Sequence, residues 1–327
     1  MAVESRETPT IYGDTIVWER PVQLAAQFFI KQGDEVLDVG GNTGGVAIAF
    51  ARMVGPLGKV YSFECNPKMI KWIREDAEAN GIKNLEVIPL AVYKSSNEKL
   101  NFYLDESFYS SASSLYRMES SSAIIVKTVS IDDLCEKNDV SPSLIKMDIE
   151  GGEADAIRGG NRTIDKFRPI VILEFSTSAD NPIRLMIDAG YDAYDVNTYR
   201  LVDEEYFDQK FSTNVVCVPR ERGLEFDLGP SKSVGGGILP VETGYYVATF
   251  DLSYSGSGIG ELSCIGPDKQ IIAYFQAEFS QLQHHSCSTI PFATSSGGTV
   301  TCEVRSLSET GEIAIAGSSM RELRLTR

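Results

Sequence analysis

The sequence predicts two domains: an α/β domain with a mostly parallel sheet over residues 1–222, and an all-β sandwich over residues 223–327. Two observations carry this prediction. Short apolar strands alternate with amphipathic helices between residues 36 and 219, which is typical of a parallel sheet covered on both faces. After Pro219 the helical pattern ends, and short alternating strands recur between turn clusters such as Gly235–Gly237, as in a β-sandwich or barrel.

The α/β domain opens with a strand, Val36–Val39, that runs into a glycine-rich turn and an apolar helix, Val46–Val54. Glycines permit positive φ angles and leave no side chain between the backbone and a ligand. A second strand, Val60–Phe63, ends in Glu64, an acid placed to accept hydrogen bonds from ribose hydroxyls. The unit therefore predicts a nucleoside site, and a βαβ turn that holds no ligand is the structural alternative.

The turn itself argues against a dinucleotide. From Asp38 to Gly44 it reads D-x-G-G-N-T-G, whereas a pyrophosphate loop reads G-x-G-x-x-G. A carboxylate two residues before Gly40 would repel a pyrophosphate. The same carboxylate suits a cationic amino-acid tail, such as the ammonium of S-adenosylmethionine (SAM).

The later elements continue the alternation of strands and helices. A helix is expected from Pro67 to about Asn80, because proline favours a first turn and Gly81 follows its end. A second helix should follow Glu153, and a third should end before Gly190. The remaining expected elements are strands Leu85–Leu90, Leu144–Asp148, Ile170–Phe175, Tyr191–Val196 and Asn214–Val218 and helices Glu153–Arg158 and Pro182–Ala189.

The segment after the expected strand Leu85–Leu90 does not continue the alternation of strands and helices, and it is rich in serine and tyrosine. We interpret it as an insertion that contains a hairpin, Lys99–Leu104 with Ile124–Val129, around a polar loop, Ser110–Tyr116. The loop should lie over the mouth of the ligand site, with Ser113 and Ser114 contacting a substrate. Hydroxyl groups of this kind suit sugar hydroxyls, and a solvated surface loop is the alternative.

The C-terminal part contains alternating segments but no convincing helix. The expected strands are Tyr245–Tyr254, Ile271–Phe279, Thr299–Arg305, Glu312–Ala316 and Glu322–Leu325. The adjacent His284 and His285 would point to opposite faces of a strand, so they should not chelate one metal ion. Most aromatic residues here should belong to the core, and two or three could form a sugar platform.

Composition limits the partners. The net charge of −16 argues against a nucleic-acid or anionic-membrane surface. No apolar run is long enough to span a bilayer, and the N-terminus lacks a signal-peptide core. Six cysteines occur without a C-x-x-C pair, so we expect all of them to be reduced core residues. These features predict a cytoplasmic protein with no membrane span, and they leave a homodimer open.

Four acids lie at the carboxyl ends of four expected strands: Asp38, Glu64, Asp148 and Glu174. Ligands of an open α/β sheet bind beyond these ends, and the strands themselves are apolar. Each acid therefore marks a step from the buried sheet to the ligand crevice. Helix N-caps offer a structural alternative for any one of the four.

The segment after the fourth strand adds detail, because Asp148, Glu150 and Glu153 fall within six residues. Carboxylates this close raise one another's pKa unless a cation intervenes. The cation could be a sulfonium, a substrate amine, Lys146 or a metal ion. The expected helix begins at Glu153 after a Gly-Gly turn.

Four motifs together resemble the FkbM family of SAM-dependent methyltransferases. The resemblance covers roughly residues 30 to 220, and the last motif is the most specific. Family members usually have alanine where this chain has Gly41, and often where it has Gly152. The motifs are Val36–Gly44, Phe63–Pro67, Val129–Leu134 and Ile145–Glu153.

The resemblance implies a class I methyltransferase fold, which is Rossmann-like with a seven-stranded sheet, and SAM as the methyl donor. The family usually methylates a hydroxyl of a sugar or natural product, so the acceptor should be a small molecule or a glycan. The implied cofactor-binding residues are Asp38, Gly40, Gly41, Asn42, Gly44, Glu64, Asn66 and Ala91. The tail lies outside the resemblance and looks like a jelly-roll module of the carbohydrate-binding kind.

Methyl transfer to a hydroxyl needs a group that accepts the hydroxyl proton. No histidine precedes residue 284, so the catalytic candidates are Asp148, Glu174, Glu150 and Lys146, and Glu153 is a candidate substrate contact. If their strands are neighbours, Asp148 and Glu174 could share Mg²⁺ or Mn²⁺, or they could orient the substrate by hydrogen bonds. The competing functions are a non-catalytic SAM-fold scaffold with a binding β-domain and a nicotinamide oxidoreductase, for which a proton relay is missing.

Overall fold

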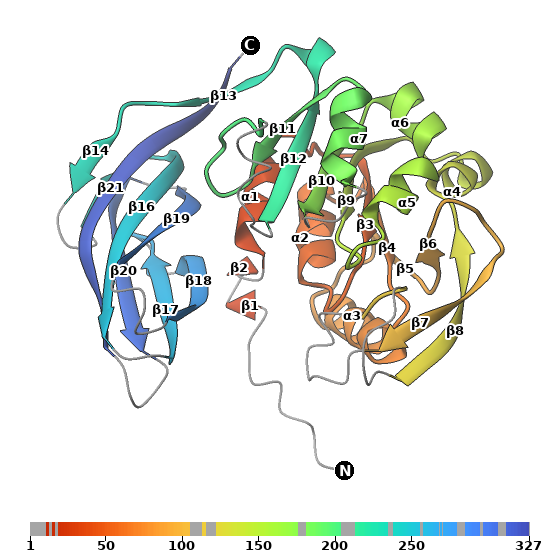
Figure 1. The fold of residues 1–327 in the computed structure, drawn as a ribbon, viewed down its shortest axis with the longest axis horizontal. Coiled ribbons are helices and arrows are strands. Elements are labelled where there is room, and N and C mark those ends of the chain that lie inside the picture. Colours follow the sequence, from red (N-terminus) through yellow and green to blue (C-terminus); the bar gives the residue numbers. More distant parts are fainter. Residues whose placement is uncertain are drawn as a thin grey trace. The chain divides into compact units, whose positions relative to one another are not determined.

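The computed structural model describes residues 11–12, 15–16, 19–104, 113–115, 122–175, 181–203, 213–234, 238–255, 258–267, 269, 271–279, 285–294, 297–306 and 312–326. The chain divides into two compact units (Figure 1). Residues 25–196 and 200–224 form one, called here the α/β unit, and residues 1–24, 197–199 and 225–327 form the other, the β unit. The division falls near the proposed boundary at 222/223 and also assigns two short segments to the β unit.

A seven-stranded sheet forms the centre of the α/β unit. Its order is β11-β12-β10-β9-β3-β4-β5, and β12 runs antiparallel to both of its neighbours, whereas the other pairs are parallel. The strands are β3 (Glu35–Val39), β4 (Lys59–Phe63), β5 (Leu85–Ile88), β9 (Pro142–Met147), β10 (Ile170–Phe175), β11 (Tyr191–Asp195) and β12 (Thr213–Pro219). The mostly parallel seven-stranded sheet predicted from the sequence is therefore confirmed.

Central strands of this sheet are buried on both faces, which explains their nearly continuous apolar sequences. In β10, the side chains of Ile170, Val171, Ile172 and Leu173 are all 0% exposed. Residues of one face join a large core cluster that includes side chains of the covering helices. The carboxyl ends of β3, β4, β9 and β10 are thus fixed side by side, and this fixes the side chains that follow them.

The helices lie between the strands in sequence, as expected (Figure 1). Asn66 and Asn181 cap α3 and α7, and each is followed by a proline in the first turn. Ser130 caps α4 by accepting from the Asp133 N–H. The helices are α1 (Arg20–Gln27), α2 (Gly45–Val54), α3 (Pro67–Ala79), α4 (Ile131–Asn138), α5 (Glu153–Arg158), α6 (Asn161–Phe167) and α7 (Pro182–Asp188), with a 3-10 turn η1 (Arg220–Arg222).

The predicted insertion forms a small sheet of its own, with the order β6-β8-β7. Its strands are β6 (Ala91–Val92), β7 (Lys99–Leu104) and β8 (Ser122–Val129). The antiparallel hairpin of β7 and β8 confirms the expected one. Of the predicted loop Ser110–Tyr116, only residues 113–115 belong to the described part of the chain.

The β unit contains two larger antiparallel sheets. One has the order β13-β21-β16-β19, with β14 also paired to β21, and the other has the order β15-β20-β17-β18. Both contribute to one buried cluster around Phe250 and Phe292. The strands are β13 (Glu225–Leu228), β14 (Lys232–Val234), β15 (Ile238–Val241), β16 (Gly244–Ser255), β17 (Gly258–Ile265), β18 (Ile271–Phe279), β19 (His285–Thr294), β20 (Gly298–Ser306) and β21 (Glu312–Thr326), and a separate pair is β1 (Ile11–Tyr12) with β2 (Thr15–Ile16).

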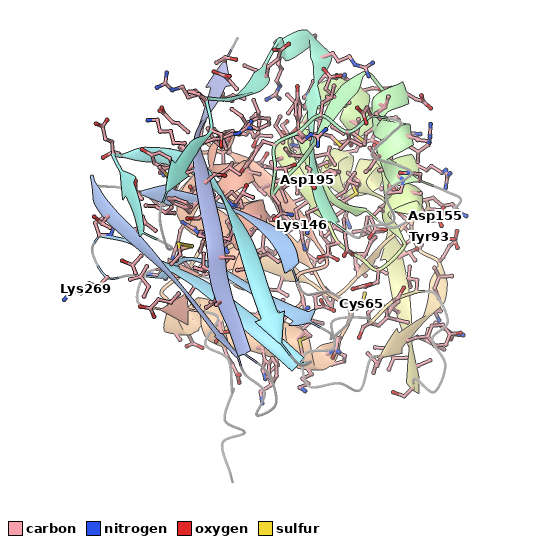
Figure 2. All side chains as sticks on the ribbon, turned by 60° about the vertical axis from the view of Figure 1, so that its left-hand side comes forward. Cys65, Tyr93, Lys146, Asp155, Asp195 and Lys269 are labelled. Carbon is pink, nitrogen blue, oxygen red and sulfur yellow. A yellow bond between two sulfur atoms is a disulfide. The ribbon has the colours of Figure 1, made fainter. Side chains whose placement is uncertain are left out.

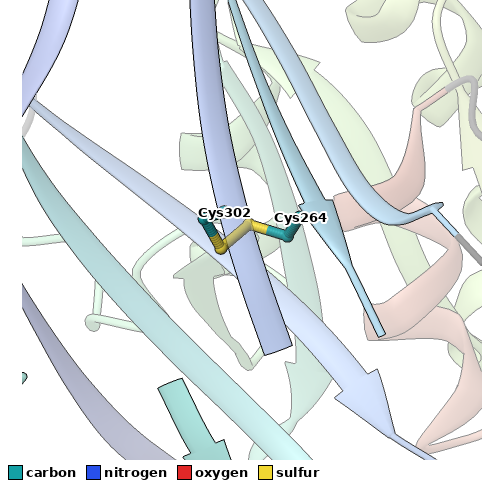
Figure 3. Close-up of a disulfide and its surroundings, with 2 residues drawn as sticks. All are labelled: Cys264 and Cys302. Carbon is teal, nitrogen blue, oxygen red and sulfur yellow. A yellow bond between two sulfur atoms is a disulfide. The ribbon is translucent and has the colours of Figure 1, made fainter. Parts of the chain in front are cut away.

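Two sequence-based expectations for this unit were wrong. The two strands expected at Glu312–Ala316 and Glu322–Leu325 are one continuous strand, β21. Cys264 and Cys302 are not reduced, because they form a disulfide between directly paired positions of β17 and β20 (Figure 3). The jelly-roll assignment stays a prediction.

The expectation of reduced core cysteines is confirmed in the α/β unit, where Cys65, Cys135 and Cys217 are free and buried. Burial raises the pKa of the Cys135 thiol to about 11. None of the helices in the described part of the chain combines the length and apolar character needed to cross a membrane.

Candidate cofactor and acceptor site

The glycine-rich turn joins β3 to α2 and folds back onto the end of β4. The N–H groups of Gly40 and Gly41 both donate to the Phe63 carbonyl oxygen, at 3.0 and 2.9 Å. Gly40 has φ +87°, and a Cβ there would overlap the carbonyl oxygen of Asp148. Glycine at this position therefore allows the turn and the segment after β9 to meet.

Asp38 lies next to this turn and is fully buried. Its Oδ2 accepts a 2.7 Å hydrogen bond from the Ser62 hydroxyl. Its Oδ1 is buried without a hydrogen-bond partner and lies 3.9 Å from Lys146 Nζ. Burial raises the pKa of Asp38, while Lys146 and Ser62 oppose that rise.

Lys146 connects the two sides of the site. It projects from β9, its side chain is 3% exposed, and its Nζ donates a 3.1 Å hydrogen bond to the Gly40 carbonyl oxygen. The same Nζ lies 3.5 Å from Asp148 Oδ2, in addition to its contact with Asp38. Lys146 is labelled in Figure 2. One buried cation is therefore shared by Asp38 in β3 and Asp148 just after β9.

Glu64, the predicted ribose ligand, is also buried, and its carboxylate holds the surrounding backbone. Its Oε2 accepts from the Asn42 N–H at 2.8 Å, and its Oε1 accepts from the N–H groups of Cys65 and Asn66, both at 2.7 Å. Burial raises the pKa of Glu64, and these hydrogen bonds oppose the rise. Glu64 thus fastens the glycine-rich turn to the end of β4, and its contact with ribose stays a prediction.

The other predicted cofactor residues are Asn42, Gly44, Asn66 and Ala91. Asn42 has φ +43°, and its Oδ1 is buried without a hydrogen-bond partner. Gly44 has φ +88° and forms the N-cap of α2, and Asn66 caps α3 through Lys68 N. Ala91 begins β6 and is 6% exposed.

Three predicted catalytic acids come together at the ends of β9 and β10. Asp148, Glu150 and Glu174 each offer a carboxylate oxygen, and these atoms lie within 4.8 Å of one another. Glu150 has φ +55°, a left-handed conformation that costs a residue other than glycine about 1–3 kcal/mol. Because β9 and β10 are neighbours, Glu174 lies beside Asp148, as expected for that strand order, and the turn after β9 adds Glu150 in a strained conformation.

Glu153, a predicted substrate contact, has a different set of partners in the structure. It begins α5 and is 3% exposed. Its Oε1 accepts from the Ile149 N–H at 2.8 Å, and its Oε2 accepts from the Gly151 N–H at 3.1 Å. Burial raises its pKa. The observed contacts hold the turn that carries Glu150, and a contact with an acceptor stays a prediction.

Ser114, from the insertion, reaches the same turn. Its backbone pairs with Tyr103 of β7 in both directions, and its hydroxyl donates a 2.9 Å hydrogen bond to the Glu150 carbonyl oxygen. Ser114 is 3% exposed, and its neighbour Ser113 is half-buried. The insertion therefore contacts the acid-bearing turn directly.

Sequence reasoning missed two residues of the site. Ser62 is a polar residue inside an apolar strand, and this was the available signal in the sequence. The structure pairs it directly with Asp38 across β3 and β4. Cys65 packs with Ala91, Phe102 and Val126 in a buried cluster that attaches the insertion to the end of β4. Figure 2 labels Cys65. Nothing in the local sequence indicated this contact.

The sheet order and the single antiparallel strand β12 define the class I SAM-dependent methyltransferase fold. Residues 38–194 match the family model described as the methyltransferase FkbM domain, so the chain contains such a domain. The matched range includes all the site residues placed above.

Individual relatives resemble parts of the chain. A protein-L-isoaspartate O-methyltransferase of Methanothrix thermoacetophila is 35% identical over 89 residues, which are 27% of this chain and 42% of that protein. The chain thus spans about two-fifths of that curated relative's length. The ubiquinone/menaquinone biosynthesis C-methyltransferase UbiE of Francisella tularensis is 22% identical over 247 residues, 72% of this chain and 82% of that protein. Among solved structures, methyltransferase FkbM from Methylobacillus flagellatus has a TM-score of 0.38 and 15% identity, covering 57% of this chain and 43% of that one.

Proposed function

We propose that this chain is a SAM-dependent O-methyltransferase that acts on a hydroxyl of a sugar, a glycan or a glycosylated metabolite. The observation that carries the proposal is the shared position of Lys146, 3.9 Å from Asp38 and 3.5 Å from Asp148. It links the turn suited to a cofactor with the acids suited to an acceptor. Methyl transfer requires these two sites to be adjacent, because the donor and acceptor must meet in line.

The residues at the glycine-rich turn fit SAM. Oδ1 of Asp38 and Oδ1 of Asn42 are buried acceptors without hydrogen-bond partners, and buried polar groups of this kind are normally satisfied. The ammonium of the methionine tail would satisfy the Asp38 oxygen. Glu64 lies one residue beyond β4, where an acid can accept from ribose hydroxyls. When bound, SAM supplies an electrophilic methyl group on a sulfonium.

The acids on the other side fit the acceptor. With SAM bound, the new bond from the acceptor oxygen to the methyl carbon would replace the bond from that carbon to sulfur, leaving the neutral thioether S-adenosylhomocysteine. The hydroxyl proton must leave as well, and a carboxylate within hydrogen-bond reach can take it. We assign that role to Asp148, because Lys146, 3.5 Å from its Oδ2, links this acid to the glycine-rich turn. Glu150 and Glu174 are then placed to accept hydrogen bonds from neighbouring hydroxyls of the acceptor.

A divalent cation is the second candidate for this step. Asp148, Glu150 and Glu174 present oxygens within 4.8 Å of one another, a spacing that a single Mg²⁺ or Mn²⁺ could bridge. The ion would lower the pKa of the acceptor hydroxyl. Among the described residues, no other group of three acids, histidines or cysteines has this spacing.

A sugar acceptor is supported by the neutral and acidic hydrogen-bonding groups around the turn. Ser114 contacts that turn, and Glu150 is exposed. We further propose that the β unit is a carbohydrate-binding sandwich, that the protein is cytoplasmic, and that it forms no complex with nucleic acid. A homodimer is compatible with these proposals.

The experiment compares ligands directly. Isothermal titration with SAM and with NAD, followed by transfer of a labelled methyl group from SAM to a panel of sugars, separates the three candidate functions. Binding of SAM with methyl transfer to a hydroxyl supports the proposal. Binding of SAM without transfer to any acceptor favours a scaffold, and binding of NAD alone favours an oxidoreductase.

A further inference from the structure

Ser62 and Asp38 form a buried pair across the two central strands β3 and β4. They are directly opposite in the parallel register, and both side chains are 0% exposed. The Ser62 hydroxyl donates to Asp38 Oδ2 at 2.7 Å, within the range of a strong charge-assisted hydrogen bond. This contact fixes the orientation of the carboxylate group, because one of its two oxygens is held.

Gly41 provides the space for this pair. A Cβ built on Gly41 would overlap the Ser62 oxygen and would lie 3.1 Å from Ile73 Cδ1 and 3.5 Å from Asp38 Oδ2. Alanine at this position would therefore compete with the serine hydroxyl for the same volume. Glycine here and serine on the next strand form a matched combination.

The held carboxylate leaves one oxygen for another partner. Asp38 Oδ1 is buried and lacks a hydrogen-bond partner, with Lys146 Nζ at 3.9 Å, beyond hydrogen-bonding distance. Lys146 donates instead to the Gly40 carbonyl oxygen. The geometry thus reserves one acceptor on the cofactor side of the sheet.

We propose that Ser62 is a positioning residue for the amino-acid tail of SAM: it holds Asp38 so that the free oxygen receives the SAM ammonium, and Gly41 makes room for it. This inference rests on the proposed function, since it concerns the same cofactor. It predicts that loss of the Ser62 hydroxyl weakens binding only of ligands that carry the ammonium. The adenosine part of the cofactor would be bound independently of it.

The test compares two ligands in isothermal titration. S-Adenosylhomocysteine carries the amino-acid tail, and 5′-methylthioadenosine carries the same nucleoside without it. We expect Ser62→Ala to weaken binding of S-adenosylhomocysteine about 10- to 150-fold, as for loss of a hydrogen bond to a charged group. Binding of methylthioadenosine should change less than about twofold. Ser143→Ala is the matched control. Ser143 lies at the start of β9, away from the carboxyl end of the strand, and its hydroxyl donates to the Glu35 carbonyl oxygen at 3.3 Å.

Ser62→Cys places a somewhat larger and weaker donor at the same position, and its effect should fall between those of serine and alanine. In a double-mutant cycle, Gly41→Ala should weaken binding strongly in the presence of Ser62 and much less together with Ser62→Ala. Equal weakening of both ligands by Ser62→Ala, or additive effects in the cycle, would overturn the inference. Failure of the wild-type chain to bind either ligand would instead defeat the proposed function.

Discussion

The hydroxyl of Ser114 donates a 2.9 Å hydrogen bond to the backbone carbonyl oxygen of Glu150. The two residues are 36 positions apart, and the contact joins the insertion to the turn after β9. Glu153 holds the same turn from the other direction through the N–H groups of Ile149 and Gly151. The strained conformation of Glu150 therefore has two supports, one from the insertion and one from the start of α5.

Ser114→Ala should reduce turnover by about fivefold, because a neutral hydrogen bond contributes about 1 kcal/mol. The affinity for SAM should not change, since Ser114 contacts the acid-bearing turn rather than the glycine-rich turn. Steady-state methyl transfer and SAM titration measure the two effects separately. The control is Ser141→Ala, an exposed serine before β9. A loss of SAM affinity in the Ser114 variant would contradict the assigned role.

Lys146→Met should destabilise the chain by about 3–5 kcal/mol, because it leaves a buried carboxylate without its cation. The control is Lys59→Met, which removes a 2.6 Å ion pair with Glu86 whose side chains are 43% and 51% exposed. That change should cost less than about 1 kcal/mol. Urea unfolding measures both.

The double variant Lys146→Met with Asp38→Asn should recover part of the lost stability, because the unpaired buried charge is then removed. A double variant that is less stable than Lys146→Met alone would show that the Asp38 charge is not the source of the loss.

Much of the α/β unit could be predicted because its signals are local. A short, mostly apolar run with β-branched residues, such as Ile170–Phe175, is typical of a buried strand, and the observed β10 has the same bounds. Asparagine and proline at the start of α3 and α7 likewise indicate where these helices begin. Asp148 and Glu174 lie close together because β9 and β10 are parallel neighbours, which was the condition for the expected proximity of these two acids.

The remaining features depend on contacts between distant residues. The disulfide Cys264–Cys302 follows from the register of β17 and β20, which their separation of 38 residues does not reveal. The strand β17 was not predicted, because its glycines Gly258 and Gly260 are untypical of a strand. Glu153 was expected to contact the substrate because it lies close in sequence to Asp148 and Glu150. The sequence could not show that backbone N–H groups donate to both oxygens of Glu153.

Asp38 should make stability depend on pH. Burial raises the pKa of Asp38 above its unfolded value of about 3.9, so the unfolded chain loses its proton first as the pH rises. The contribution of Asp38 to the free energy of unfolding is therefore present below the unfolded pKa and is lost as the pH rises through the folded pKa. Asparagine does not titrate.

The difference in unfolding free energy between wild type and Asp38→Asn should consequently decrease as the pH rises through this window. Glu64 and Glu153 also have raised pKa values, but both chains contain them, so their contributions largely cancel. Urea unfolding from about pH 4 to pH 8 measures the difference. A difference that stays constant or grows with pH would show that Asp38 is not the group responsible.

Asp148→Asn should lower turnover by about 10²- to 10⁴-fold, the usual contribution of a general base, with little effect on SAM affinity. Glu174→Gln should lower turnover less if it only orients the acceptor. Assays in EDTA decide between the two roles of the acids: activity that is lost and then restored by Mg²⁺ or Mn²⁺ assigns them to a metal. Full activity in EDTA leaves direct proton transfer. Normal turnover of Asp148→Asn would remove Asp148 from the mechanism.

The end of the α/β unit determines where the chain can be shortened. Glu221 pairs with Arg168 at 2.6 Å, and Arg222 donates to the Arg168 carbonyl oxygen at 2.7 Å. Arg220 pairs with Asp192 at 2.8 Å. A cut inside residues 220–222 would remove these contacts, so the sequence-based boundary after residue 222 leaves little margin.

We expect residues 1–224 to fold and to bind SAM with unchanged affinity, because the site residues placed above all precede residue 175. If the β unit binds carbohydrate, the shortened chain should keep its turnover on a small sugar and lose affinity for a long glycan. If the β unit instead supports folding or a dimer, both acceptors should suffer equally, or the fragment should be insoluble. Sedimentation of both chains, with assays on a short and a long acceptor, distinguishes these outcomes, and the equal loss would defeat the carbohydrate-binding proposal.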